Sequence, residues 1–335
     1  MNNRFYPKLI PGKAIAIYSP SSNVASEYPD RLIRSVKALE RTLNTKVVLP
    51  EQVCFSRGFT AGTALERAQA FESLLLDHSI AGIMCSIGGF NSAEILEHLN
   101  RDIVCRYPKV LIGNSDATAL ILGIFSLSGW TTYFGPTLLP QFGEYPQPFA
   151  FTIENLFSAI GNNETLTELR DPAAWTREFT DWGESPQRRR LMGKDSHRIV
   201  YREGLGEGIL FGGNIETLNM LVGTPYLNIP SDIIFFWEAH AEEARLERVR
   251  RALTHLRQSG ILSHVRGMLI GRSPYCTDIA GVTLKDTVLE ACADFDFPIV
   301  ANLSFGHTDP MLTLPIGVLA NVCVMKGSEA RITIV

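Results

Sequence analysis

The first 160 residues alternate between short apolar runs and longer stretches with helical spacing. The apolar runs end at proline, glycine or asparagine, as buried strands do, and lie at residues 13–20, 46–50, 80–89 and 109–114. The stretches that follow them are typical of helices and lie at residues 28–43, 65–78, 91–100 and 116–129. Strands that alternate with helices and are apolar throughout predict a parallel sheet with helices on both faces.

The pattern changes after about residue 160. Residues 161–205 are polar and interrupted by proline and glycine, yet they contain Trp175, Phe179 and Trp182, so we expect a linker with an aromatic loop. A second alternation then predicts strands at 232–240, 265–272 and 297–306, helices at 242–262 and 284–295, and a closing β region at 313–335. The predicted organisation is an N-terminal domain at 1–160, the linker at 161–205 and a C-terminal domain at 206–335.

The composition is that of a globular protein: 335 residues, 45% hydrophobic and 20% charged, with a net charge of -4. No lysine or arginine stripe offers a surface for a nucleic-acid polymer, and the one basic run, residues 188–190, predicts a solvated loop face. No apolar stretch reaches the roughly 18 residues that a membrane span needs, and no leader pattern opens the chain. The six cysteines are scattered without a CxxC pair, which favours a reducing, cytoplasmic location.

Ser115 lies between the apolar run at 109–114 and a long helical stretch, in the sequence G-N-S-D-A. A serine at this junction can cap the helix, because its hydroxyl accepts a hydrogen bond from the first turn. Alternatively, it is a nucleophile on a sharp turn between strand and helix, with the next backbone N–H facing the oxyanion. Ala117 stands where such a turn has its second glycine, so this motif alone leaves both interpretations open.

Gly88 and Gly89 end the preceding predicted strand. Glycines let the backbone approach a ligand closely, and N–H groups at such a turn can hold an anion or an oxyanion, although a tightly packed turn would use the same residues. The phosphate-binding patterns GxGxxG and GxxxxGK[ST] are both absent. Because ligands bind at the carboxyl ends of parallel strands, we expect the two glycines and Ser115 to lie near one site.

A serine nucleophile needs a base, and two residues of the second half suit that chemistry. His307 follows an apolar strand and a glycine, in a turn where catalytic side chains tend to lie. Glu238 interrupts a strand-like apolar run, where a carboxylate is either a satisfied structural group or the residue that orients His307 in a triad. A metal site is a further alternative, since Glu238, His240, His307 and Asp309 are zinc or manganese ligand types, but no HExxH or short paired spacing supports it.

Together, eight short stretches resemble the LD-carboxypeptidase family of serine peptidases, which includes muramoyl-tetrapeptide carboxypeptidases and microcin C immunity proteins. They occur in the family's order over nearly the whole chain: AIYSPSS, SIGGFNSAEIL, GNSDATAL, YFGPTLLPQFGEYP, GILFGGNIETL, FFWEAH, GMLIGR and FGHTDPMLTLPIG. The resemblance implies a catalytic triad of Ser115, Glu238 and His307. It also implies that the backbone N–H groups of Gly89 and Asp116 are the oxyanion donors.

The resemblance further implies an α/β fold, with an N-terminal parallel-sheet (flavodoxin-like) domain and a C-terminal α/β domain that has a β-barrel-like core. It implies a homodimer and no metal or organic cofactor. Ala239 is a departure, since relatives often carry an aspartate after the triad glutamate, but Glu238 itself is present. The N-S-D form, the GPTLLPQFGEY stretch and the tryptophan-bearing loop are more similar to the microcin immunity branch than to the cell-wall branch.

We therefore expect a serine carboxypeptidase-type amide hydrolase, with a small peptide or an aminoacyl-nucleotide as its partner and no membrane. The first hypothesis is microcin-immunity-like cleavage of an aminoacyl-nucleotide amide, with Trp175 or Trp182 stacked on the base and Gly88 beside the substrate. The second hypothesis is a muramoyl-tetrapeptide LD-carboxypeptidase in peptidoglycan recycling. The third is a non-catalytic module that binds a small molecule in the cleft between two domains.

Overall fold

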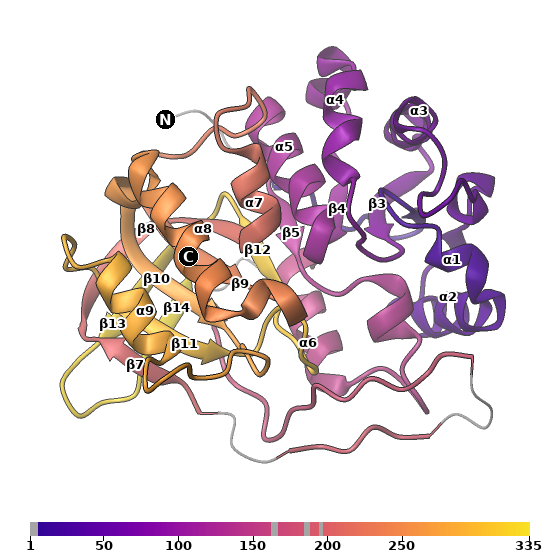
Figure 1. Ribbon diagram of the computed structural model, residues 1–335. Helices are drawn as coiled ribbons and strands as arrows, with labels where there is room; N and C mark the ends of the chain where they lie inside the picture. The colour runs from indigo at the N-terminus through magenta and orange to yellow at the C-terminus, as the bar shows by residue number, and fades with distance from the viewer. Residues whose placement is uncertain (1–5, 162–166, 184–187, 194–196) are drawn as a thin grey trace.

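The computed structural model describes residues 6–161, 167–183, 188–193 and 197–335. Within these ranges the chain forms a six-stranded and an eight-stranded sheet that lie side by side, each with its own helices (Figure 1). The predicted α/β class is confirmed, with a parallel first sheet and a curled, half-barrel second sheet. Every helix in the described ranges is too short or too polar to span a lipid bilayer.

The first sheet has the strand order β12-β5-β4-β3-β1-β2. Its strands are β1 (Ala14–Tyr18), β2 (Val47–Val48), β3 (Ile80–Cys85), β4 (Val110–Gly113), β5 (Thr132–Phe134) and β12 (Leu314–Ile316). Strands β1 to β5 are parallel in the order 2-1-3-4-5, which is the flavodoxin-like arrangement. Strand β12 comes from the far end of the chain and pairs antiparallel with β5.

Helices cover both faces of the first sheet. Successive side chains of each strand point to opposite faces, so apolar side chains on each face pack against helices. These helices are α1 (Val24–Glu27), α2 (Pro29–Leu43), α3 (Ala64–Leu76), α4 (Arg101–Arg106), α5 (Thr118–Ser128) and α6 (Ala150–Ile160). Ile15 and Ile17 of β1 pack in one cluster with α2 and α6, whereas Ala16 and Tyr18 pack in another with α3, α4 and α5.

The predicted helix at 91–100 is instead a 3₁₀ segment, η2 (Ser92–His98). Asn91 gives this segment no side-chain cap, and the backbone N–H of Ser92 donates to the carboxylate of Asp116 at 2.9 Å. This contact binds η2 to the turn after β4.

The second sheet is mixed, in the order β6-β14-β13-β8-β9-β10-β11-β7. Its strands are β6 (Thr167–Glu168), β7 (Ile199–Arg202), β8 (Gly204–Asn214), β9 (Ile233–Glu238), β10 (Val265–Gly271), β11 (Ile299–Leu303), β13 (Leu319–Val324) and β14 (Arg331–Ile334). Strands β8 to β11 are parallel, and the flanking strands are antiparallel. Its helices are α7 (Ile215–Leu221), α8 (Leu246–Gln258) and α9 (Leu284–Ala291).

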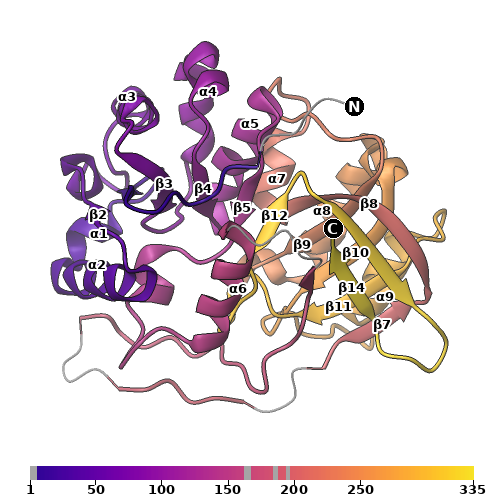
Figure 2. The ribbon, with the colours of Figure 1, turned by 180° about the vertical axis from the view of Figure 1, so that it is seen from behind.

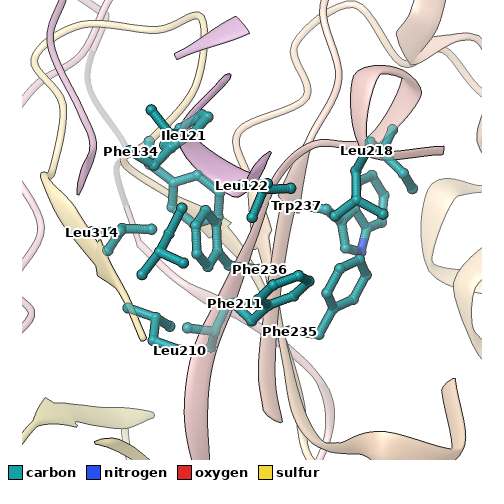
Figure 3. Packing of buried hydrophobic residues seen from close by; sticks show 14 of the residues in the cluster. Ile121, Leu122, Phe134, Leu210, Phe211, Leu218, Phe235, Phe236, Trp237 and Leu314 are labelled. Carbon is teal, nitrogen blue, oxygen red and sulfur yellow. The ribbon is translucent and has the colours of Figure 1, made fainter. Parts of the chain in front are cut away.

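The two sheets share one hydrophobic core where α5, β5 and β12 meet β8 and β9 (Figure 3). The ring centroid of Phe134 on β5 lies 5.5 Å from that of Phe236 on β9. At the end of β8, the backbone N–H of Asn214 donates to Thr118 Oγ1 at the start of α5, at 3.0 Å. The view from behind shows β12 beside β5, between the two halves (Figure 2). The predicted division at 1–160, 161–205 and 206–335 stays a prediction. Strand β12 lies beyond residue 206 in sequence but pairs within the first sheet.

Within residues 161–205, β6 and β7 belong to the second sheet, and the described parts between them run along the lower edge of both halves (Figure 1). Thr176 exchanges two backbone hydrogen bonds with Asp309, at 2.7 and 3.0 Å. The prediction of a solvated face at residues 188–190 is wrong for Arg190, whose side chain is only 12% exposed and forms ion pairs with Glu144 and Asp309. Two buried carboxylates need a cation between them, and this tertiary requirement outweighs the tendency of a basic run to stay in water.

Candidate active site

Ser115 lies on a sharp turn between β4 and α5. Its φ of 55° is in the left-handed region, which few residues other than glycine adopt and which is found often at functional sites. The turn begins with a hydrogen bond from the Ala117 N–H to the Asn114 carbonyl, at 3.0 Å. Helix α5 has Ala117 at its N-cap position and no side-chain cap, so the structure does not use Ser115 as a helix cap.

Ser115, His307 and Glu238 form a continuous chain of hydrogen bonds. The Nε2 atom of His307 lies 3.0 Å from Ser115 Oγ, and its Nδ1 atom lies 2.7 Å from Glu238 Oε2. With a proton on Nδ1, His307 donates to Glu238 and its Nε2 accepts from the serine hydroxyl. Glu238 ends strand β9 and is fully buried, and its other oxygen accepts a hydrogen bond from Asn214 Nδ2 at 3.2 Å.

The electrostatics of this chain favour a basic imidazole. Burial lowers the pKa of His307, but the charge of Glu238 and its hydrogen bond raise it, as do the more distant Glu243 and Asp309. The net result is a pKa above the ordinary histidine value. A neutral His307 can therefore accept a proton from Ser115, and Glu238 stabilises the imidazolium that results.

The Gly88–Gly89 turn packs directly against the serine turn. A Cβ atom on Gly88 would lie 2.9 Å from Ser115 Cβ and 3.2 Å from the backbone nitrogen of Asp116, so only glycine fits there. Gly89 has a φ of 153°, and a Cβ atom there would lie 2.2 Å from Ser21 Oγ. The Ser92 hydroxyl donates to the Asp116 carbonyl at 2.5 Å, which fixes one turn against the other.

A cavity of about 460 Å³ opens beside Ser115. Ser115, His307, Gly88 and Gly89 line one part of it, and the rest includes residues of both halves and of the aromatic loop. Trp182 lines the cavity, with the Arg31 guanidinium 4.0 Å from the centre of its ring.

Two other aromatic side chains contact Trp182, one from the loop itself and one from the start of α2. Phe179 lines the cavity, is 73% exposed and lies 5.8 Å from Trp182 between ring centroids. Tyr28, at the start of α2, meets the Trp182 ring edge-on at 5.6 Å. Trp175, the second predicted stacking residue, is not among the residues that line the cavity and has the Arg272 guanidinium 5.1 Å from its ring.

Three of the four side chains of the metal hypothesis bind other residues, and the fourth, His240, stacks on His307. Glu238 and His307 bind each other, and Asp309 pairs with Arg190 at 2.8 Å and accepts a hydrogen bond from Gln141 at 3.2 Å. Among the described residues, no three histidine, cysteine or acidic side chains are grouped so that they could hold a metal ion. The arrangement of Ser115, His307 and Glu238 can supply a nucleophile, a base and an acid that orients the base.

Comparison with known proteins places this chain in a family. Models of the LD-carboxypeptidase N-terminal domain and the LD-carboxypeptidase C-terminal domain match residues 15–135 and 207–322. The chain belongs to the LD-carboxypeptidase family. The predicted resemblance is confirmed, and membership of this peptidase family supports a serine peptidase.

Similarity to individual members of the LD-carboxypeptidase family extends over nearly the whole chain. The microcin C7 self-immunity protein MccF of Escherichia coli is 30% identical over 312 residues, which is 92% of this chain and 89% of MccF. A solved structure of MccF in complex with glutamyl sulfamoyl guanosine has a TM-score of 0.90 and 28% identity, covering 98% of both chains. An MccF-like protein from Bacillus anthracis has a TM-score of 0.87 and 29% identity, covering 99% of both chains.

Two residues that support this site, Asn214 and Arg190, were not predicted from the sequence. Asn214 supports Glu238, and Arg190 connects the aromatic loop to Asp309. Asn214 follows a Gly-Gly pair at a strand end, which is the same signal that singled out Gly88 and Gly89. Arg190 had no such signal, because a basic residue in a polar segment is most often exposed.

Proposed function

We propose that this protein is an amide hydrolase in which Ser115 is the nucleophile, His307 the base and Glu238 the acid that orients the base. The observation that carries the proposal is the hydrogen-bonded chain from Ser115 Oγ through His307 to Glu238, at 3.0 and 2.7 Å, at the wall of a cavity. The strained backbone of Ser115 supports it as well.

The reaction takes place in two stages. Ser115 Oγ attacks the carbonyl carbon while its proton passes to His307 Nε2, and the backbone N–H groups of Gly89 and Asp116 hold the oxyanion, each worth about 3 kcal/mol. The intermediate collapses as the C–N bond breaks and the leaving nitrogen takes the proton from His307. Water then attacks the acyl-enzyme with His307 again as base, which releases the acid and restores Ser115.

We propose an aminoacyl-nucleotide amide as the substrate. The cavity holds two aromatic rings of the loop, Trp182 and Phe179, and base–aromatic stacking is worth roughly 1–3 kcal/mol per base. Arg31 covers one side of Trp182, so the substrate base would stack on the other side. A structure of the relative MccF contains glutamyl sulfamoyl guanosine, which has an aminoacyl and a nucleoside part. Trp175 lies outside the cavity lining, so the stacking proposal rests on Trp182.

The second candidate is an LD-carboxypeptidase that removes the terminal D-residue of a muramoyl tetrapeptide. The observation in its favour is that both family models that match this chain represent LD-carboxypeptidase domains. The same triad would attack either substrate, because both contain a carbonyl joined to nitrogen.

The experiment offers both substrates to the same enzyme. Purified protein is incubated with glutamyl sulfamoyl guanosine and with a muramoyl tetrapeptide, and the products are identified by mass spectrometry, with Ser115→Ala as control. We expect release of glutamate from the first substrate and less than about a thousandth of that rate in Ser115→Ala. Shortening of the tetrapeptide alone would support the second candidate. No cleavage, with Ser115 unlabelled by a fluorophosphonate probe, would leave the binding-module hypothesis.

We also propose that the enzyme acts as a homodimer in the cytoplasm. All six cysteines, each within the described residues, are free thiols, which suits a reducing compartment. The homodimer rests on the resemblance to the family, and light scattering on the purified protein tests it.

A further inference from the structure

The imidazole ring of His240 packs against that of His307, the proposed base of the triad. Its imidazole ring lies parallel to that of His307, with ring centroids 4.1 Å apart and an angle of 14° between the planes. His240 follows Glu238 by two residues, so the strand end that provides the acid also provides this ring. Nothing in the triad chemistry requires a second histidine at that place.

Two ring contacts and one backbone hydrogen bond hold His240 in place. Its other neighbour is Tyr275, which meets it edge-on with centroids 5.0 Å apart. Its backbone N–H donates to Glu243 Oε2 at 3.2 Å, and the same oxygen accepts from Asn214 Nδ2 at 2.7 Å. Asn214 also donates to Glu238, so one network connects the acid with the backbone of the residue that bears the stacked ring.

The two rings have pKa values shifted in opposite directions. Burial lowers the pKa of His240 to about 4, and the nearby charge of His307 adds to this effect, while Glu238 acts in the opposite direction. His307, which faces Glu238, Glu243 and Asp309, has a raised pKa. His240 is therefore neutral when His307 takes up a proton, and the two imidazoles do not repel each other.

We propose that His240 is a positioning residue: its stacked ring keeps the imidazole plane of His307 aligned between Glu238 and Ser115. This inference rests on the proposed function. The Glu238 contact restrains one atom of the His307 ring, but the ring can still rotate about that hydrogen bond. A parallel ring at van der Waals distance blocks this rotation, and small displacements of a base lower the rate strongly.

The test compares His240→Ala, which removes the stacked ring, with His240→Phe, which keeps a flat ring that cannot titrate. The readout is the rate at which a fluorophosphonate labels Ser115, since this reaction needs an activated serine and no natural substrate. We expect labelling of His240→Ala to be about ten- to hundredfold slower than wild type, and labelling of His240→Phe to recover most of that loss. Thermal unfolding of both variants shows whether the fold persists.

A second readout separates positioning from a structural role. The proton on His307 Nδ1 that is shared with Glu238 gives a far-downfield proton NMR resonance when the ring is held in place. We expect it in wild type and His240→Phe, and broadened or lost in folded His240→Ala. Wild-type labelling together with a sharp resonance in His240→Ala would overturn the proposal, as would equal loss in both variants. Absence of Ser115 labelling in the wild type would instead contradict the proposed function.

Discussion

At the scale of single residues, Glu238 is a fully buried carboxylate that accepts hydrogen bonds from His307 and Asn214. Its charge helps to raise the pKa of His307 above the ordinary histidine value. The base must be neutral to accept the serine proton, so we expect kcat/KM to fall as the pH is lowered through that raised pKa. A pH–rate profile of the wild type measures it.

Glu238→Gln should lower kcat by about a thousand- to ten-thousandfold, because the amide keeps the shape but cannot stabilise the imidazolium. The acid limb of the pH–rate profile should also move to lower pH, since the charge that raises the pKa of His307 is gone. Glu243→Gln is the comparison variant, because this carboxylate contacts Asn214 but not His307 and raises the pKa of His307 less than Glu238 does, so both effects should be much smaller. Equal losses in the two variants, or inhibition of the wild type by a chelator, would contradict the assigned role.

Trp182 provides a prediction that distinguishes the two substrates. Trp182→Ala should weaken processing of the aminoacyl-nucleotide by roughly 1–3 kcal/mol, which is up to a hundredfold, through the loss of base stacking. Cleavage of a muramoyl tetrapeptide should hardly change, because that substrate has no base. Trp175→Ala, whose ring lies outside the cavity lining, is the control and should affect both substrates equally. Equal losses on both substrates in Trp182→Ala would exclude the stacking role.

At the scale of elements, the aromatic loop is attached to both halves through Arg190. The guanidinium contacts Glu144, which follows the π-helical turn η4 (Leu138–Phe142), and Asp309, two residues after His307. It also lies 5.4 Å from the ring centre of Phe149, and its Nη1 donates to the Glu178 carbonyl at 3.2 Å. The loop is therefore connected to the same turn that carries His307.

Arg190→Met should loosen this loop. Removal of one partner from a buried ion network costs about 3–5 kcal/mol, because Glu144 and Asp309 lose the cation that both contact. We expect faster limited proteolysis within residues 167–193 and a higher KM for the aminoacyl-nucleotide. Arg188→Met is the matched control, since its side chain is 58% exposed and such surface pairs are worth at most about 1 kcal/mol. Equal proteolysis in the two variants would show that Arg190 does not hold the loop.

At the scale of the whole molecule, the two halves share one core instead of meeting across a polar interface. Side chains of α5, β5 and β12 lie in the same hydrophobic cluster as those of β8 and β9 (Figure 3). Phe236 is fully buried there and lies near both Phe134 and Phe305, with centroids at 5.5 and 5.7 Å. Neither half can open without exposing part of this cluster.

We therefore expect the chain to unfold in one cooperative transition despite its length. Phe236→Ala should lower the free energy of unfolding by about 3–5 kcal/mol and shift the whole transition. Urea unfolding followed by both far-UV circular dichroism and tryptophan fluorescence measures this. Two separate transitions in the wild type, or loss of only one half in Phe236→Ala, would show that the halves are independent.

The sequence by itself determined the strands and the long helix α5 near the site, because burial on a sheet or helix face leaves a local, periodic pattern, whereas the predicted helix at 91–100 is the 3₁₀ segment η2. The runs ending at Gly89 and Asn114 became β3 and β4, and Ser115, Glu238 and His307 were all singled out at or after strand ends. Their convergence was predicted only through resemblance to a family. Periodicity places each residue on its own element but contains no information about distances between elements.

Tertiary structure alone decided the contacts between residues that are far apart along the chain. Strand β12 joined the first sheet, Arg190 was buried between Glu144 and Asp309, and Trp175 came to lie outside the cavity lining while Trp182 joined it. The parallel ring of His240 against His307 belongs here as well. Each outcome depends on which surfaces meet when the two sheets share a core, and no local pattern of apolar and polar residues contains that choice.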